Sequence, residues 1–329
     1  MSDHSRSYNK YQGKRLSDLL GSFTFVSSKN LQGSNILTKK KVGDIREEHK
    51  MLALVKTKEN EGVTASLEFC KEKEARPITL VNSIGEGFDS RSDHYTQREV
   101  FIQNARPLID SLTLDQDGFA LIQKHTAVGN FYDDSEVENV YYPEIEQLLQ
   151  KVTGASKVLI FDHTRRIDDK ESLSKKNART PATIVHNDFT ISSAKQRVRD
   201  LLPTDEAESR LKKRFASINV WRAMREPVET AQLSICNYSS IADDDLIIAE
   251  RHYADNRVGR IYNLAFNPIQ RWYYFPKLMR NEMVLLKCYD SLTDGTARWT
   301  AHGSFKDPEE VTNSTPRESI EIRSMLFFE

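Results

Sequence analysis

The chain has 329 residues, 38 % of them hydrophobic, which is enough to bury a sizeable core in one elaborated domain. Its 47 lysines and arginines nearly equal its 48 aspartates and glutamates, so the formal net charge of −1 excludes a strongly basic nucleic-acid-binding protein. There is no apolar run of about 18 residues, no apolar signal-peptide core near the N-terminus, and only three scattered cysteines. We therefore expect a soluble cytoplasmic protein with neither a membrane span nor a disulfide framework.

The first 60 residues are the least typical of a folded domain. They are rich in serine, lysine, asparagine and glutamate, and they contain the basic run 39–41. Such a composition buries too little apolar surface to offset the entropy lost on ordering. We expect a mobile or loosely docked arm over 1–60 and a single folded domain over 61–329.

The next part of the chain mixes strands with helices. Residues 63–69 alternate in polarity as a strand does, and the apolar run 157–161 predicts another strand. The clearest helix is expected over 139–153, where Gly154 stands at the position of a C-terminal cap. Its apolar positions recur at helical spacing: Ile145, Leu148, Leu149 and Val152. We interpret 162–165 as a turn held by buried polar bonds.

Strands dominate the C-terminal half. A second helix is expected to begin with Ser192 or Ser193 as its N-cap, and a third lies around 205–215. Short apolar stretches separated by Pro, Asp, Gly and Asn then follow at intervals typical of a sandwich or small barrel. These stretches are 217–222, 230–236, 245–252, 259–266, 271–275, 282–289, 297–305 and 318–327. The expected fold is mainly β with α: a helical N-terminal support over about 100–155 and a β-barrel core over about 156–329.

Several common catalytic signatures are absent. The sequence has no GxxxxGK[ST] phosphate loop, no GxGxxG, no GxSxG and no HExxH. Nucleotide hydrolysis, dinucleotide redox chemistry and α/β-hydrolase chemistry are therefore disfavoured. Cys236 and Cys288 lie in apolar strand runs, so they are expected to be buried and reduced rather than catalytic.

One histidine has an acidic partner at a spacing that suits metal binding. Of the eight histidines, only His186 is followed two positions later by an acidic residue, Asp188. About one such pair is expected by chance in a chain with this many acidic residues, so the surrounding sequence must show whether the pair can bind a metal. The segment 183–190 contains apolar and β-branched residues typical of a strand, on which positions i and i+2 share a face. His186 and Asp188 can therefore bind one ion side by side.

A third ligand would complete a known metal centre. Two histidines and one carboxylate form the facial triad of non-haem Fe(II) oxygenases, which leaves positions for an oxo-acid and O₂. His302, in the predicted strand 297–305, fits because the third ligand usually comes from a strand near the far end of such a barrel. The alternative is that His302 is a hydrogen-bonded histidine of the barrel wall.

A basic strand follows His302. On the strand 318–327 and the residues just before it, Arg317, Ser319 and Arg323 point to one face. A guanidinium binds a carboxylate through two parallel hydrogen bonds and a nearby hydroxyl adds one more, so Arg317 with Ser319 can clamp the far carboxylate of 2-oxoglutarate. Arg323 ranks second, because it is also a candidate ion-pair partner of Glu321. A solvated strand face with alternating charges is the alternative for both arginines.

Ten sequence blocks together carry a family resemblance. They are 117–119, 141–144, 153–155, 158–165, 186–188, 219–222, 271–276, 287–291, 302–305 and 316–323. In this order they resemble the fungal hydroxylase/desaturase family typified by AsaB, which includes gibberellin-desaturase-like proteins and relatives of the cephamycin component CmcJ. The resemblance extends from about residue 100 to the C-terminus.

The resemblance implies a fold, a metal and a reaction. The implied fold is a double-stranded β-helix, a jelly-roll or cupin-like barrel, in which His186, Asp188 and His302 hold Fe(II). The implied cosubstrates are 2-oxoglutarate, clamped by Arg317 with Ser319, and O₂. The implied activity is hydroxylation, desaturation or cyclisation of a secondary-metabolite or amino-acid-derived substrate by hydrogen abstraction from a C–H bond.

Two rival interpretations stay open at this point. One is a barrel-based accessory protein that binds without catalysis, and the other is a metal-dependent isomerase or dioxygenase that does not use 2-oxoglutarate. Under the favoured interpretation the partner is a small-molecule substrate, with no nucleic acid and no membrane. The identity of that substrate and the oligomeric state cannot be read from the residues.

Overall fold

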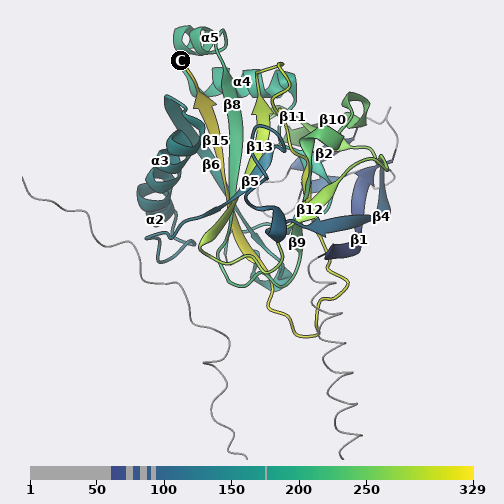
Figure 1. Cartoon of the computed structure of the whole chain (residues 1–329). Helices are drawn as coiled ribbons and strands as arrows, with labels where there is room; N and C mark the ends of the chain where they lie inside the picture. The colour runs from purple at the N-terminus through teal and green to yellow at the C-terminus, as the bar shows by residue number, and fades with distance from the viewer. Residues whose placement is uncertain (1–60, 72–76, 82–86, 90–93, 175) are drawn as a thin grey trace, which may run out of the picture. The chain divides into compact units, whose positions relative to one another are not determined.

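The structure is a computed structural model that describes residues 61–71, 77–81, 87–89, 94–174 and 176–329 (Figure 1). The arm predicted over 1–60 lies outside the described residues. Within the described part, no helix is long and apolar enough to cross a membrane.

Two β-sheets make up the body of the described chain. The larger has ten described strands, in the spatial order β1 (Gly62–Cys70), β4 (Tyr95–Asn104), β12 (Trp272–Tyr274), β9 (Gln232–Cys236), β14 (His302–Phe305), β7 (His186–Asn187), β11 (Val258–Leu264), β10 (Leu246–Tyr253), β2 (Ile78–Val81) and β3 (Gly87–Asp89). The smaller has five, in the order β5 (Phe119–Gln123), β13 (Glu282–Asp290), β8 (Phe215–Ala223), β15 (Glu318–Phe327) and β6 (Lys157–Ile167). All strands predicted after residue 216 are present; β15 spans the predicted 318–327, and the others have at least one shifted end.

The main hydrophobic core lies between the two sheets. It joins Trp221 and Met325 of the smaller sheet to Leu233 and Ile235 of the larger one. Two facing, mostly antiparallel sheets with a filled interior form a double-stranded β-helix. The predicted fold class, mainly β with a few helices, is therefore confirmed.

Helix α3 (Tyr142–Thr153), with the short α2 (Asp134–Glu136) before it, covers the outer face of the smaller sheet (Figure 1). Ile145 and Leu149 of α3 share a core with Ile320 of β15. The predicted cap is confirmed, because Gly154 ends the helix with the left-handed φ of 74°. Val152, predicted to belong to the buried stripe, is 42 % exposed, so the stripe stops one turn before the helix ends.

The second helix, α4 (Ile191–Leu201), begins earlier than predicted. Its N-cap is Thr190, because the Thr190 hydroxyl accepts the Ser193 backbone N–H at 3.1 Å and the Ser193 hydroxyl accepts the Thr190 N–H at 2.9 Å. The prediction of Ser192 or Ser193 as the cap is wrong. The third helix, α5 (Thr204–Arg210), is shorter than predicted, since Phe215 already begins β8.

Strands β6, β4 and β5 correct two further predictions. Residues 162–165 are not a turn, because β6 continues through them to Ile167 along β15. The buried polar bonds expected there do exist: Arg165 donates to the Phe131 carbonyl at 2.5 Å and to Asp134 at 2.6 Å. The sheets also include β4 and β5, so the region 100–155 supplies strands as well as the helical support.

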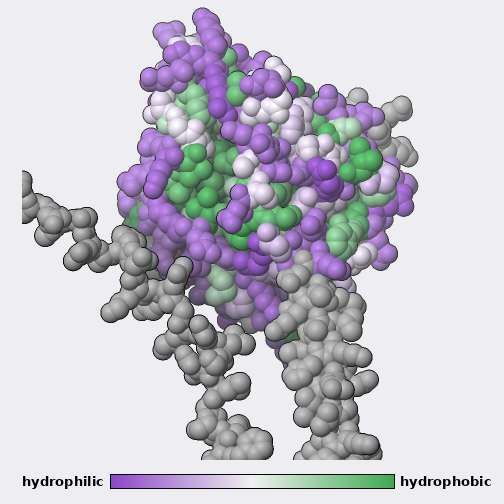
Figure 2. Space-filling view, viewed as in Figure 1, coloured by the Kyte–Doolittle hydropathy of each residue, from purple (hydrophilic) through white to green (hydrophobic). Residues whose placement is uncertain are grey.

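Two remaining features are the distribution of hydrophobic side chains on the surface and the burial of the cysteines. Figure 2 shows hydrophobic side chains gathered over the strands beside α3 and framed by hydrophilic ones. Cys70, Cys236 and Cys288 are all buried, and Cys236 and Cys288 are free thiols, as expected. Burial raises the pKa of the Cys236 thiol to about 12, which leaves it protonated and unreactive.

Candidate metal centre

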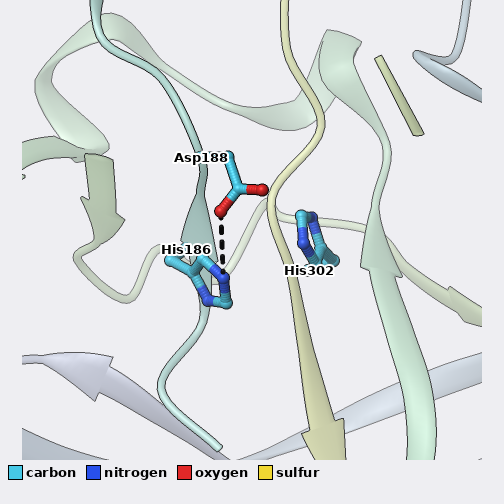
Figure 3. Close-up of side chains that lie close together, drawn as sticks. All are labelled: His186, Asp188 and His302. Carbon is cyan, nitrogen blue, oxygen red and sulfur yellow. Dashed lines mark ion pairs between the residues drawn. The ribbon is translucent and has the colours of Figure 1, made fainter. Parts of the chain in front are cut away.

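His186 and His302 stand opposite each other on neighbouring strands. The strand predicted over 183–190 is reduced to the two residues of β7, yet this short strand pairs on both sides, with β14 and with β11. In the pairing with β14, His302 is the direct partner of His186. The two rings therefore lie on one face, with their centroids 4.8 Å apart (Figure 3).

Asp188 completes the group just beyond the end of β7. Its Oδ1 lies 3.6 Å from His186 Nε2, and one ligand atom from each of His186, Asp188 and His302 lies within 4.8 Å of the others. Asn187, between the two ligands, donates its side-chain amide to the carbonyls of Phe189 and Cys288 at 2.7 and 2.9 Å. These two bonds fix the turn that brings Asp188 back beside His186.

Both imidazoles are oriented by backbone carbonyls. His186 Nδ1 lies 2.7 Å from the Ile184 carbonyl and His302 Nδ1 lies 3.1 Å from the Thr300 carbonyl. Since a carbonyl oxygen only accepts, each Nδ1 carries the proton and each Nε2 keeps a lone pair for a metal. Burial, aided by the nearby His302, lowers the pKa of His186 to about 3, so His186 is neutral as a ligand must be.

The Asp188 carboxylate has one oxygen engaged and one available. Its Oδ2 accepts from Asn219 Nδ2 at 2.6 Å and from Arg323 Nε at 3.2 Å. Burial opposes ionisation of Asp188, but the Arg323 guanidinium outweighs it and holds the pKa well below its usual range. Two imidazoles and one carboxylate, with three ligand atoms converging, are the donor set that suits Fe(II).

A cavity adjoins the three side chains. It has an empty volume of about 300 Å³, and its lining includes His186, His302, Trp221, Leu233, Arg317 and Glu321. Arg317 is 2 % exposed; its Nη1 donates to the Ala231 carbonyl, while its Nε is buried without a partner. Burial lowers the pKa of Arg317 to about 9. A buried cation that lines a cavity and keeps one N–H unpaired fits a carboxylate ligand.

The other two predicted cosubstrate residues are placed differently. Ser319 is buried on the strand after Arg317, and its hydroxyl lies 3.5 Å from the Arg166 carbonyl. Arg323 does not line the cavity: besides Asp188 it donates to Asp162 at 2.8 Å and to Thr164 at 2.9 Å. Its predicted contact with Glu321 is longer, at 3.9 Å. Arg323 therefore braces the metal-binding carboxylate.

Sequence reasoning missed two residues of the site, Asn219 and Arg166. Asn219 donates one amide nitrogen both to Asp188 and, at 2.6 Å, to Glu321, so it bridges two buried carboxylates. The available signal was its strand position, because Asn219 and Trp221 share a face of β8. Arg222, in the same block, is structural: it is fully buried and donates to the Tyr141 hydroxyl at 2.9 Å.

Comparisons with known proteins agree with this geometry. A family model described as "Oxidoreductase/YMDC permease-like domain" matches residues 67–327. The "Hydroxylase/desaturase CTB9" of Cercospora beticola is 31 % identical over 71 % of this chain and 78 % of its own length. The "Fe(II)/2-oxoglutarate-dependent dioxygenase nvfI" of Aspergillus novofumigatus is 31 % identical over 71 % of this chain and 84 % of its own. The solved structure of "iron and alpha-ketoglutarate-dependent endoperoxidase NvfI" is similar with a TM-score of 0.72 and 27 % identity, covering 82 % of this chain and 98 % of that one.

Proposed function

Because the chain belongs to the oxidoreductase/YMDC permease-like family, together with fungal hydroxylase/desaturases, we propose that it oxidises a small secondary metabolite with Fe(II), 2-oxoglutarate and O₂. It is a non-haem Fe(II)/2-oxoglutarate-dependent oxygenase. One observation supports this most: three converging ligand atoms lie beside a cavity that also holds the buried, partly unpaired Arg317.

His186, Asp188 and His302 would hold the iron. When bound there, Fe(II) supplies the one-electron and O₂ chemistry that protein side chains lack. The chain contributes orientation: carbonyls fix both imidazoles, and Asn219 with Arg323 fixes the carboxylate. These contacts would hold the three ligands in place around a bound Fe(II), which would supply binding positions for the cosubstrate and O₂.

Arg317 would hold the far carboxylate of 2-oxoglutarate. Its side chain lines the cavity that also adjoins both histidines, so it would bind the far carboxylate of a dicarboxylate held at the metal centre. Trp221 and Leu233 line the same cavity with apolar surface, which excludes water and strengthens the ion pair. Ser319, whose hydroxyl lies 3.5 Å from the Arg166 carbonyl, would add one hydrogen bond to that carboxylate only if its side chain turned toward the cavity.

The reaction outcome depends on the position of the substrate. Removal of hydrogen from a C–H bond can lead to hydroxylation, desaturation or ring closure, and differences on the order of 1 Å decide between them. We propose a secondary-metabolite or amino-acid-derived small molecule as the substrate, with neither nucleic acid nor membrane as partner. A cytoplasmic location stays a prediction.

The test uses cosubstrate turnover. Purified protein with Fe(II), O₂ and 2-oxoglutarate is expected to release succinate, and His302→Ala is expected to abolish that release while the circular dichroism spectrum stays unchanged. Full activity of His302→Ala would overturn the metal assignment. No succinate from the wild type with any candidate substrate would favour the accessory-protein alternative, and O₂ consumption that needs no 2-oxoglutarate would favour the other rival enzyme class.

A further inference from the structure

Arg166 lines the same cavity as Arg317 and the two histidines. It lies on β6 directly opposite Ser319 of β15, and opposite residues on antiparallel strands share a face. Its Nη1 donates to the Thr180 carbonyl at 2.7 Å. No carboxylate oxygen of the described residues lies within ion-pair distance of Arg166 or of Arg317. Neither guanidinium group therefore forms an ion pair with a described carboxylate, and Glu321 is the one acidic residue among the described residues that line the cavity.

Burial destabilises the charge of both arginines, and the charge of Arg166 further destabilises that of Arg317. Burial is the main cause that lowers the pKa of Arg317 to about 9, and the positive charge of Arg166 is the next. Burial likewise lowers the pKa of Arg166 to about 10. Both values stay above neutral pH, so both groups are charged and repel one another. An anion bound between them would remove this repulsion.

Binding of a carboxylate in this cavity requires the positive charge of more than one arginine. Glu321 is 5 % exposed and lines the same cavity, so its negative charge cancels that of Arg317 and opposes an incoming carboxylate. With Arg166 included, the lining carries two positive charges and one negative, since the histidines are neutral as metal ligands. One carboxylate then brings the lining to neutrality.

We propose that Arg166 is a second arm of the clamp that binds the far carboxylate of 2-oxoglutarate, opposite Arg317. This inference rests on the proposed function and assigns a cosubstrate-binding role to a residue outside the predicted Arg317, Ser319 and Arg323. It implies that Arg166 contributes to the choice of a dicarboxylic oxo-acid over a monocarboxylic one. It acts on binding of the cosubstrate and not on the metal.

The experiment measures oxo-acid binding without turnover. Anaerobic protein with Fe(II) is titrated with 2-oxoglutarate and with 2-oxobutanoate, which has the same chelating end but no far carboxylate, while the metal-to-ligand charge-transfer absorbance is followed. Arg166→Gln is expected to raise the half-saturating 2-oxoglutarate concentration by about tenfold or more, the usual loss for one charged hydrogen bond. The value for 2-oxobutanoate is expected to change by less than about twofold.

Two further variants sharpen the result. Arg166→Lys keeps the charge and is expected to lose less affinity than Arg166→Gln. Arg199→Gln removes an exposed arginine of α4 that pairs with Glu208, and it is expected to bind both oxo-acids as the wild type does. Equal weakening of both oxo-acids, or unchanged 2-oxoglutarate binding in Arg166→Gln, would overturn the role of Arg166. A wild type that gives no absorbance band with either oxo-acid would instead overturn the proposed function, and this inference with it.

Discussion

At the scale of single residues, the two oxygens of Asp188 have different tasks. Oδ2 is held by Asn219 and Arg323, whereas Oδ1 faces His186 and is available to a metal. The pairing of His186 with Asp188 was predictable from their spacing of two residues, although Asp188 lies beyond the end of β7 and a turn, not strand periodicity, brings it beside His186. The contact of Asp188 with Arg323 was not, since it joins residues 135 apart in the chain and depends on how the two sheets face each other.

Replacement of Arg323 tests whether its contact with Asp188 Oδ2 supports metal binding through Oδ1. Arg323→Gln removes a charged donor from the metal-binding carboxylate, so Fe(II) affinity is expected to fall by about 10–100-fold, the usual effect of losing such a supporting contact. Anaerobic Fe(II) titration measures the change, with Arg199→Gln as the surface control. Unchanged Fe(II) affinity together with a strongly raised 2-oxoglutarate requirement would instead place Arg323 in the cosubstrate clamp.

Replacement of Arg317 tests the cosubstrate clamp. Arg317→Ala is expected to raise the 2-oxoglutarate concentration needed for half-maximal turnover roughly a hundredfold, because a bidentate charged contact is lost. Ser319→Ala removes one neutral donor and is expected to cost about tenfold or less. Steady-state kinetics with varied 2-oxoglutarate measures both. If Arg317→Ala leaves the requirement unchanged, the cavity beside the histidines does not hold the cosubstrate.

At the scale of elements, the metal-binding segment is short and is fixed at both ends. β7 has only two residues, but it is paired on both sides, and the helix α4 begins at once after Thr190. The sequence predicted a longer strand and a later cap because Thr190, Ser192 and Ser193 are all acceptable caps by residue type. Only the hydrogen-bond geometry distinguishes among them.

The cap of α4 makes a stability prediction. Thr190→Ala leaves the Ser193 N–H without its acceptor, so the free energy of unfolding is expected to fall by about 1 kcal/mol. Ser192→Ala is the matched control: the Ser192 hydroxyl lies 3.1 Å from the Thr190 hydroxyl but accepts no backbone N–H, so a smaller loss is expected. Urea unfolding of both variants measures the difference. If Ser192→Ala lowers the free energy of unfolding more than Thr190→Ala does, a serine and not Thr190 caps the helix.

At the scale of the whole molecule, the spacing of the C-terminal strands was enough to predict a barrel. That spacing did not predict that β1 and β4 belong to the larger sheet and β5 to the smaller one. It also did not predict that β6 continues through its polar residues. Those strands depend on partners far away in the chain: β4 pairs with β12 and β5 with β13. Local polarity cannot reveal such pairing. The closed core that results keeps His186 buried, and this burial affects the stability of the whole fold.

The metal-free protein is therefore expected to lose stability in mild acid. His186 has a pKa of about 3 when folded and 6.5 as a free side chain, so between these values the unfolded chain binds more protons. The free energy of unfolding then rises with pH in this window, by up to about 1.4 kcal/mol per pH unit. Above the window His186 is neutral in both states and adds no pH dependence. Asp188 acts with the same sign at lower pH, because its depressed pKa stabilises the fold above about 3.8 and the effect is lost as pH falls below.

Urea unfolding of the metal-free protein at about pH 7 and about pH 5 measures this slope. His186→Gln has no titrating group at this position, so its free energy of unfolding is expected to change less between the two pH values than that of the wild type. His252→Gln removes a surface histidine of β10 and controls for the loss of a histidine as such. A slope in His186→Gln equal to that of the wild type would mean that the acid sensitivity of the fold arises elsewhere than at the metal centre.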